Sequence, residues 1–130
     1  MALALTQGSP MPIDGQPDRV EYTWYESGAV ESVRPYRGTK KVGTHRLCWP
    51  DGAPRLEAHY EDDAYDGVYR AWHGNGRPAE VRHFARGRES GRQQAWTPEG
   101  ILYLNYEVRG GRHYGLINAR PCVPIHEARS

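Results

Sequence analysis

Glycine recurs in this chain with a period of 24 residues, and this regularity restricts the fold more than any other feature. One set is Gly28, Gly52, Gly76 and Gly100, and a second set is Gly43, Gly67, Gly91 and Gly115. Two further columns share the period: Trp24, Cys48, Trp72 and Trp96 form one, and Tyr36, Tyr60, Phe84 and Val108 form the other. A fixed period of this size is typical of an array in which each unit packs on its neighbours. The spacing predicts four to five repeats within residues 19–118.

Each period has the pattern of a β-hairpin. Residues 68–72 and 77–84 are strand-length runs with aromatic and β-branched residues, and His73-Gly74-Asn75-Gly76 lies between them. Asn-Gly is a strong hairpin signal, and the Pro-x-Gly triplets Pro50-Asp51-Gly52 and Pro98-Glu99-Gly100 occupy equivalent places. No segment sustains helical apolar spacing. The sequence therefore predicts an all-β fold, a single-layer antiparallel β-meander without helices.

A one-layer sheet has no central core, so ladders of equivalent side chains must stabilise it. We expect Trp24, Trp72 and Trp96 to form one structural ladder, and Tyr36, Tyr60 and Phe84 a second. Adjacent aromatic residues such as Trp24 and Tyr25 point to opposite faces of a strand, and both faces cannot be core. Exposed aromatic surface usually marks an interaction site. The residues predicted to bind a partner are Tyr25, Trp49, Tyr69 and His73.

Charge and hydropathy exclude several classes of protein. The 130 residues contain 17 Lys and Arg and 16 Asp and Glu, so the net charge is +1. This balance disfavours a nucleic-acid ligand, which usually requires concentrated positive charge. No apolar run approaches the roughly 18–20 residues of a membrane-spanning helix. Contact with a membrane surface stays open as an alternative.

Composition divides the chain into three parts. Residues 1–18 are rich in Gly and Pro and predict a flexible leader, residues 19–118 carry the hairpin array, and residues 119–130 predict an irregular tail. Residues 1–18 lack the features of a complete signal peptide. Cys48 and Cys122 either pair or remain free thiols, and both alternatives stay open, as does the oligomeric state.

The repeats WYESGAVESVRPY, CWPDGAPRLEAHY, WHGNGRPAEVRHF and WTPEGILYLNYEV resemble a variant of the MORN repeat. They are most similar to the bacterial YwqK-type antitoxin family, over about residues 19–118. The resemblance implies a non-enzymatic module that binds a protein partner, as an antitoxin or immunity-type neutraliser of a toxin in the cytoplasm. Other MORN proteins imply an alternative, an envelope-associated scaffold or lipid-headgroup binder. Such a protein would be exported by a signal peptide that is absent from its mature form.

The sequence contains no catalytic constellation. It lacks a nucleophile elbow, a P-loop and a dinucleotide fingerprint, and we expect neither enzymatic activity nor a cofactor. The acidic segment 61–67 fails the spacing of a calcium loop and predicts a solvated turn. The alternative function carries the only metal candidates, Cys122 and His126 in the tail together with His113.

Overall fold

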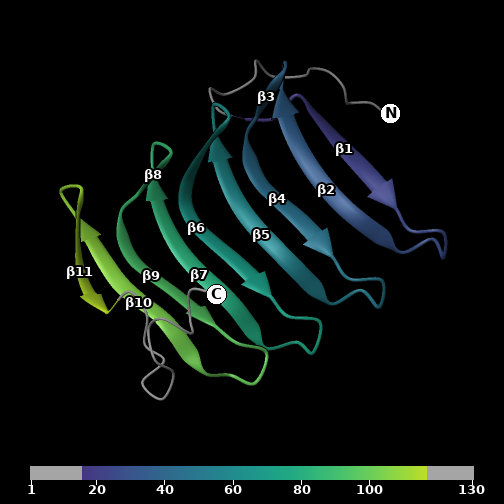
Figure 1. Ribbon diagram of the computed structural model, residues 1–130. Coiled ribbons are helices and arrows are strands. Elements are labelled where there is room, and N and C mark those ends of the chain that lie inside the picture. The colour runs from purple at the N-terminus through teal and green to yellow at the C-terminus, as the bar shows by residue number, and fades with distance from the viewer. Residues whose placement is uncertain (1–15, 117–130) are drawn as a thin grey trace, which may run out of the picture.

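A computed structural model describes residues 16–116, and within this range the chain forms one open antiparallel sheet without helices. The strand order is β1-β2-β4-β5-β6-β7-β9-β10-β11, so each strand lies beside the next one in the sequence (Figure 1). The strands are β1 Arg19–Trp24, β2 Val30–Arg37, β3 Lys40–Lys41, β4 Gly43–Cys48, β5 Pro54–Glu61, β6 Ala64–Trp72, β7 Pro78–Ala85, β8 Arg88–Glu89, β9 Gly91–Trp96, β10 Leu102–Arg109 and β11 Arg112–Leu116. The predicted single-layer meander is confirmed.

The short strands β3 and β8 are the first parts of longer strands. Strand β3 pairs with β2 and leads into β4, and strand β8 pairs with β7 and leads into β9. Val42 and Ser90 occupy the interruptions, and each donates its backbone N–H to a carbonyl on the neighbouring strand, that of Pro35 and His83 respectively. Two glycines of the second set, Gly43 and Gly91, follow these interruptions with φ values of 71° and 97°, whereas Gly67 and Gly115 lie within the continuous strands β6 and β11. Gly43 and Gly91 therefore mark breaks inside strands.

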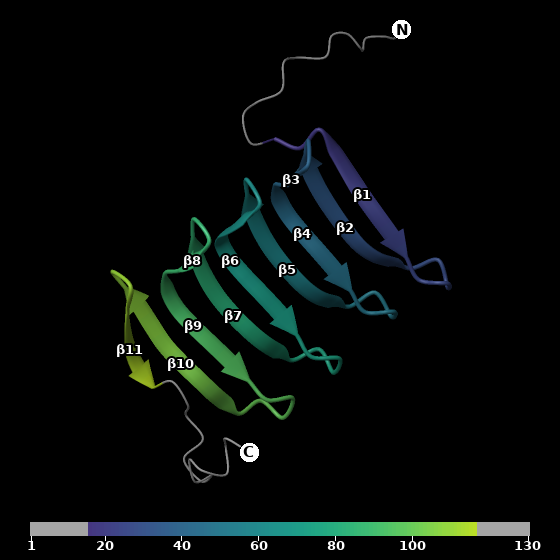
Figure 2. The same ribbon diagram turned by 45° about the horizontal axis from the view of Figure 1, so that its top comes forward.

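One end of the sheet carries four hairpin turns of the same form, at residues 25–28, 49–52, 73–76 and 97–100. We call them the inner turns, and they are stacked side by side (Figure 2). Within each turn the backbone N–H of the glycine bonds to the carbonyl three residues earlier, as Gly76 does to His73. Positive φ occurs at Gly76 but not at Asn75, so the turn is a type I turn closed by a left-handed glycine. The Asn-Gly pair predicted the place of this turn correctly.

The opposite end of the sheet carries the outer turns. Asp62 and Asp63 have φ values of 51° and 72°, and Arg86 and Gly87 have 53° and 83°. Positive φ at both central residues defines the type I′ turn, whose twist matches that of antiparallel strands. The turn predicted over 61–67 is shorter than expected, because Ala64 already belongs to β6.

The two faces of the sheet differ in burial. The buried residues within strands are Ser32, His45, Ala58, Gln93, Ala95, Tyr106 and Val108, and strand pairing with side-chain alternation places them on the same face. We call this the aromatic face, because it also carries Tyr36, Tyr60, Tyr65, Tyr69 and Phe84. The other face carries Trp24, Cys48, Trp72 and Trp96 and is called the tryptophan face. The fold buries mainly one side of a single layer.

Residues 1–15 and 117–130 lie outside the described range, which therefore holds only positions 16–18 of the predicted leader and none of the predicted tail. Asp18 is bonded to the first hairpin: its backbone N–H donates to the Tyr36 carbonyl, and its carboxylate accepts the Gly38 N–H at 3.0 Å. Cys48 forms no disulfide with a residue of the described range, and Cys122 lies outside that range. No helix among the described residues is long and apolar enough to cross a membrane.

Candidate functional site

A row of ring contacts runs across the aromatic face from β2 to β7. Centroid distances are 5.6 Å from Tyr36 to His45, 4.6 Å from His45 to Tyr60 and 5.0 Å from Tyr60 to Tyr65. Tyr65 then contacts Phe84 at 4.8 Å. The predicted ladder Tyr36, Tyr60 and Phe84 thus lies in one row, but its members touch through His45 and Tyr65. Strand spacing explains this, because equivalent residues of successive hairpins are two strands apart.

Tyr69, a predicted partner-binding residue, belongs to the same row. Its ring lies 5.5 Å from Tyr65 and 6.3 Å from Phe84, both edge to face. Burial raises the pKa of Tyr69, and the nearby Glu80 carboxylate raises it further. Tyr69 is therefore a neutral phenol at neutral pH, half-buried in a layer that no second layer of described residues covers.

The other three predicted partner-binding residues lie one position beyond the ends of strands, at the inner turns. Tyr25 donates its hydroxyl to the Cys48 carbonyl at 2.6 Å, and the His73 ring Nε2 lies 2.8 Å from the Trp96 carbonyl. Both bonds connect one repeat to the next. The equivalent Trp49 makes no such bond, and its buried Nε1 has no hydrogen-bond partner within residues 16–116. Tyr25 and His73 thus link neighbouring turns, and His73 also lines an open pocket of about 370 Å³ with Trp96 and Tyr103.

The tryptophan column does not form a ring-to-ring ladder in the described part of the chain. Trp24 is 59% exposed on the edge strand β1 and stacks on Tyr22 at a centroid distance of 5.9 Å. Trp72 and Trp96 are half-buried on the same face, one hairpin apart. Their spacing prevents direct stacking for the reason given above for the tyrosine column.

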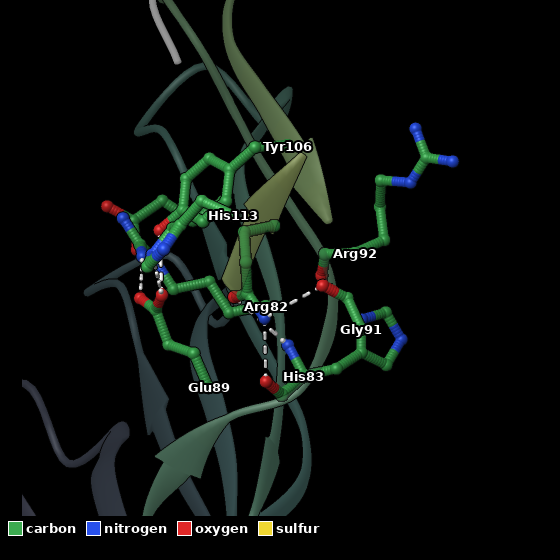
Figure 3. Close-up of polar contacts among 9 residues, drawn as sticks. Arg82, His83, Glu89, Gly91, Arg92, Tyr106 and His113 are labelled. Carbon is green, nitrogen blue, oxygen red and sulfur yellow. Dashed lines mark hydrogen bonds and ion pairs between the residues drawn. The ribbon is translucent and has the colours of Figure 1, made fainter. Parts of the chain in front are cut away.

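A polar cluster closes the aromatic row on its C-terminal side (Figure 3). The Arg82 guanidinium bonds to the Glu80 and Glu89 carboxylates at 3.1 and 3.0 Å, and the Tyr106 hydroxyl donates to Glu89 at 2.8 Å. His113, the one described metal candidate, lies 3.7 Å from Glu89. Cys122 and His126 fall outside the described residues, and within 16–116 no three potential metal ligands form a group.

Protonation in this cluster favours a structural role. Burial and the Glu89 carboxylate raise the pKa of Tyr106, so that phenol keeps its proton. Burial acts to lower the pKa of Arg82, but the Glu80 and Glu89 carboxylates outweigh it, and the net shift is upward. Neither group is poised to exchange a proton near neutral pH, which general acid–base catalysis requires.

A second set of charged residues lies at the N-terminal half of the aromatic face, and sequence reasoning missed it. Arg34, Lys41 and Tyr60 line an open pocket of about 170 Å³ together with His45, Leu47 and Leu56. The Lys41 ammonium lies 5.2 Å from the centroid of the Tyr60 ring. The 24-residue frame places Arg34 in one column with Ala58, Arg82 and Tyr106, but it gives no signal for Lys41, which lies outside this column.

The geometry defines a class of protein: a single-layer all-β repeat protein with one aromatic face. No family model, curated protein or solved structure matches the chain.

Proposed function

We propose that this chain is a non-enzymatic binding module that docks a protein partner on its aromatic face. The observation that carries the proposal is the row of half-buried rings from Tyr36 to Phe84 on a sheet with only one layer. Tyrosine and arginine are enriched where proteins bind one another, and rigid rings lose little conformational entropy on binding. A partner would provide the second layer that the described residues lack.

Residue placement supports Tyr69 as a contact residue more than the other three candidates. Tyr25 and His73 each use a polar atom inside the array, and the Trp49 indole N–H is buried, so a partner would not reach it although no described atom accepts its hydrogen bond. The proposed contact row is therefore Tyr36, Tyr60, Tyr65, Tyr69 and Phe84. The inner turns flank this row and hold its strands in register.

Photo-crosslinking in the native host tests the proposal. A photoreactive amino acid replaces Tyr69 on the aromatic face or, as the matched control, its neighbour Arg70 on the tryptophan face. We expect a discrete adduct from position 69, and the purified partner should then bind the free chain. Equal adducts from both positions, or none from either, would contradict docking on the aromatic face.

The resemblance to YwqK-type repeats suggests a finer proposal, that the partner is a toxin which the chain neutralises stoichiometrically. Co-expression with a toxin encoded beside this gene is the direct test. Rescue of growth by the wild-type chain, and its loss in a Tyr65→Ala/Tyr69→Ala variant that remains folded, would support neutralisation. Rescue that survives this double substitution would contradict a role for the aromatic face.

Binding of a lipid headgroup is the second candidate, and the cations Arg34 and Lys41 favour it. The same face presents Glu80 and Glu89 at its other half, which an anionic surface would repel. Flotation with phosphatidylserine vesicles tests this candidate directly. Failure to float would exclude it.

A further inference from the structure

The pocket beside Tyr60 contains two cations that lack a carboxylate partner. Within residues 16–116 no carboxylate oxygen lies within ion-pair distance of Arg34 or Lys41. Glu21 is the cross-strand neighbour of Arg34, but the Arg19 guanidinium holds its carboxylate at 3.0 Å. By contrast, Arg82 at the far end of the face has two carboxylate partners. The nearest carboxylate to Lys41 that the structure shows is that of Asp63, which accepts the Lys41 backbone N–H at 2.9 Å and forms no ion pair with the ammonium. Among the described residues of the aromatic face, cations without an ion pair thus occur at one end only.

The uncharged residues of the pocket reinforce this potential. His45 is buried and neutral, and its Nε2 lies 2.7 Å from the Pro35 carbonyl, so Nε2 carries the proton and donates. Burial raises the pKa of Tyr60, and a hydrogen bond with Tyr65 raises it further, so this hydroxyl stays protonated and adds no negative charge. Leu47 and Leu56 supply an apolar wall, which lowers the local dielectric and strengthens charge pairing. The pocket therefore offers two positive charges and no negative charge of its own to an incoming group.

The size and surroundings of the pocket distinguish among anions. A volume of about 170 Å³ suits one side chain with a small anionic end. A polyanion such as nucleic acid would extend along the face and meet Glu80 and Glu89, whose charge repels it. A folded partner can instead place one acidic segment on the pocket and apolar side chains on the rings further along.

We propose that the pocket formed by Arg34, Lys41 and Tyr60 receives an aspartate or glutamate side chain of the protein partner. The inference rests on the proposed function, because it specifies the chemistry of the partner that the aromatic face docks. The carboxylate pairs with Arg34 and Lys41, and apolar side chains of the partner lie on Tyr65 and Phe84. The charge difference between the two halves of the face fixes the orientation of the partner.

Charge reversal with a matched control tests the inference. The test variant is Arg34→Glu/Lys41→Glu, and the control is Lys40→Glu/Arg70→Glu, which changes net charge equally at exposed positions outside the pocket. Both variants are first compared with wild type by circular dichroism. With the purified partner we expect the test variant to bind at least about tenfold more weakly and the control to bind within about twofold of wild type.

The crosslink at position 69 separates this inference from the proposed function. If the crosslink to the partner persists equally in Arg34→Glu/Lys41→Glu, docking on the aromatic face stands and the acidic contact is wrong. If position 69 never crosslinks, the proposed function itself fails. A compensating Asp→Lys or Glu→Lys substitution on the partner that restores binding to the test variant, and not to wild type, would establish the pair.

Simple probes address the other anions. Chemical-shift titrations of the free chain use an acetylated, amidated hexaglutamate peptide, inorganic phosphate, and phosphatidylcholine vesicles with and without phosphatidylserine. We expect the peptide to perturb Arg34, Lys41 and Tyr60 more than Arg70, with the perturbation lost in the test variant. Stronger saturable binding of phosphate or of anionic vesicles at the same residues would overturn the assignment to a carboxylate.

Discussion

The buried side chain of Gln93 completes the backbone hydrogen bonding of His83 at the point where β8 and β9 are interrupted. Its Nε2 donates to the His83 carbonyl at 2.8 Å, and its Oε1 accepts the His83 N–H at 3.3 Å. His45 lies two periods earlier in the same column, and its Nε2 donates to the Pro35 carbonyl on the neighbouring strand. Gln93 faces a backbone N–H and a carbonyl at His83, whereas His45 faces Pro35, which has a carbonyl but no N–H. A single donor therefore suffices at Pro35. Each of these two buried polar side chains thus has the donors and acceptors that the backbone opposite it requires.

Gln93→Leu should destabilise the fold. The Gln93 side chain is fully buried, and its loss leaves the His83 N–H without an acceptor. The His83 carbonyl still accepts the backbone N–H of Ser90. An unsatisfied buried donor costs about 1–3 kcal/mol. Urea denaturation measures the free energy of unfolding. The control, Gln94→Leu on the tryptophan face, should change it by less than about 0.5 kcal/mol, and equal losses in both variants would contradict the role of Gln93.

His45 should make stability depend on pH. Burial lowers its pKa below the usual 6.5, and the Lys41 and Arg34 charges lower it further, against the raising effect of the Pro35 carbonyl. The unfolded chain therefore binds the proton more readily than the folded chain does. The stabilisation that neutral His45 provides is complete above pH 6.5 and is lost as the pH falls below this value. The slope approaches about 1.4 kcal/mol per pH unit at most.

His45→Gln isolates this effect, because glutamine retains a donor for the Pro35 carbonyl. The free energy of unfolding of wild type, measured by urea denaturation across this pH range, should decline toward acid more steeply than that of the variant. Parallel profiles would show that His45 does not titrate with unfolding.

The two glycines of one inner turn should respond oppositely to alanine. Gly76 has a φ of 88° and open space around its Cβ position, so alanine introduces backbone strain without a clash. Gly76→Ala should therefore cost about 1–2 kcal/mol. Gly74 has equal space and no positive φ, and Gly74→Ala should be neutral or stabilise by up to about 1 kcal/mol. Thermal unfolding of both variants gives the comparison, and similar melting temperatures would contradict the assigned turn.

The bond between repeats at Tyr25 should contribute measurably to stability. Tyr25→Phe removes the donor to the Cys48 carbonyl and retains the ring, so the expected loss is about 0.5–1.5 kcal/mol. Tyr22→Phe is the control, because Tyr22 is 49% exposed on the edge strand. Denaturant unfolding of the two variants should differ in midpoint, and no difference would mean that the bond to Cys48 contributes nothing net.

The sequence was sufficient for the meander and for the position of the inner turns, because their glycine and proline residues recur in a fixed frame. The breaks within strands could not be predicted, since Gly91 and Gly76 look alike in sequence although one interrupts a strand and the other closes a turn. Gln93 and His45 were missed because a polar residue at an alternating position predicts a surface side chain. Arg34 and Lys41 lie on different strands, and only folding brings them to one pocket.

The strands of this array pack mainly on their immediate sheet neighbours. Deleting or duplicating one period would therefore alter the length of the molecule without requiring the remaining hairpins to repack. The number of rings offered to a ligand would change in steps of one hairpin, while the cationic and acidic ends would keep their identities. Lineages of such a chain can tune the span of the surface they recognise by unequal recombination between repeats, a route closed to proteins whose core is shared by all their parts.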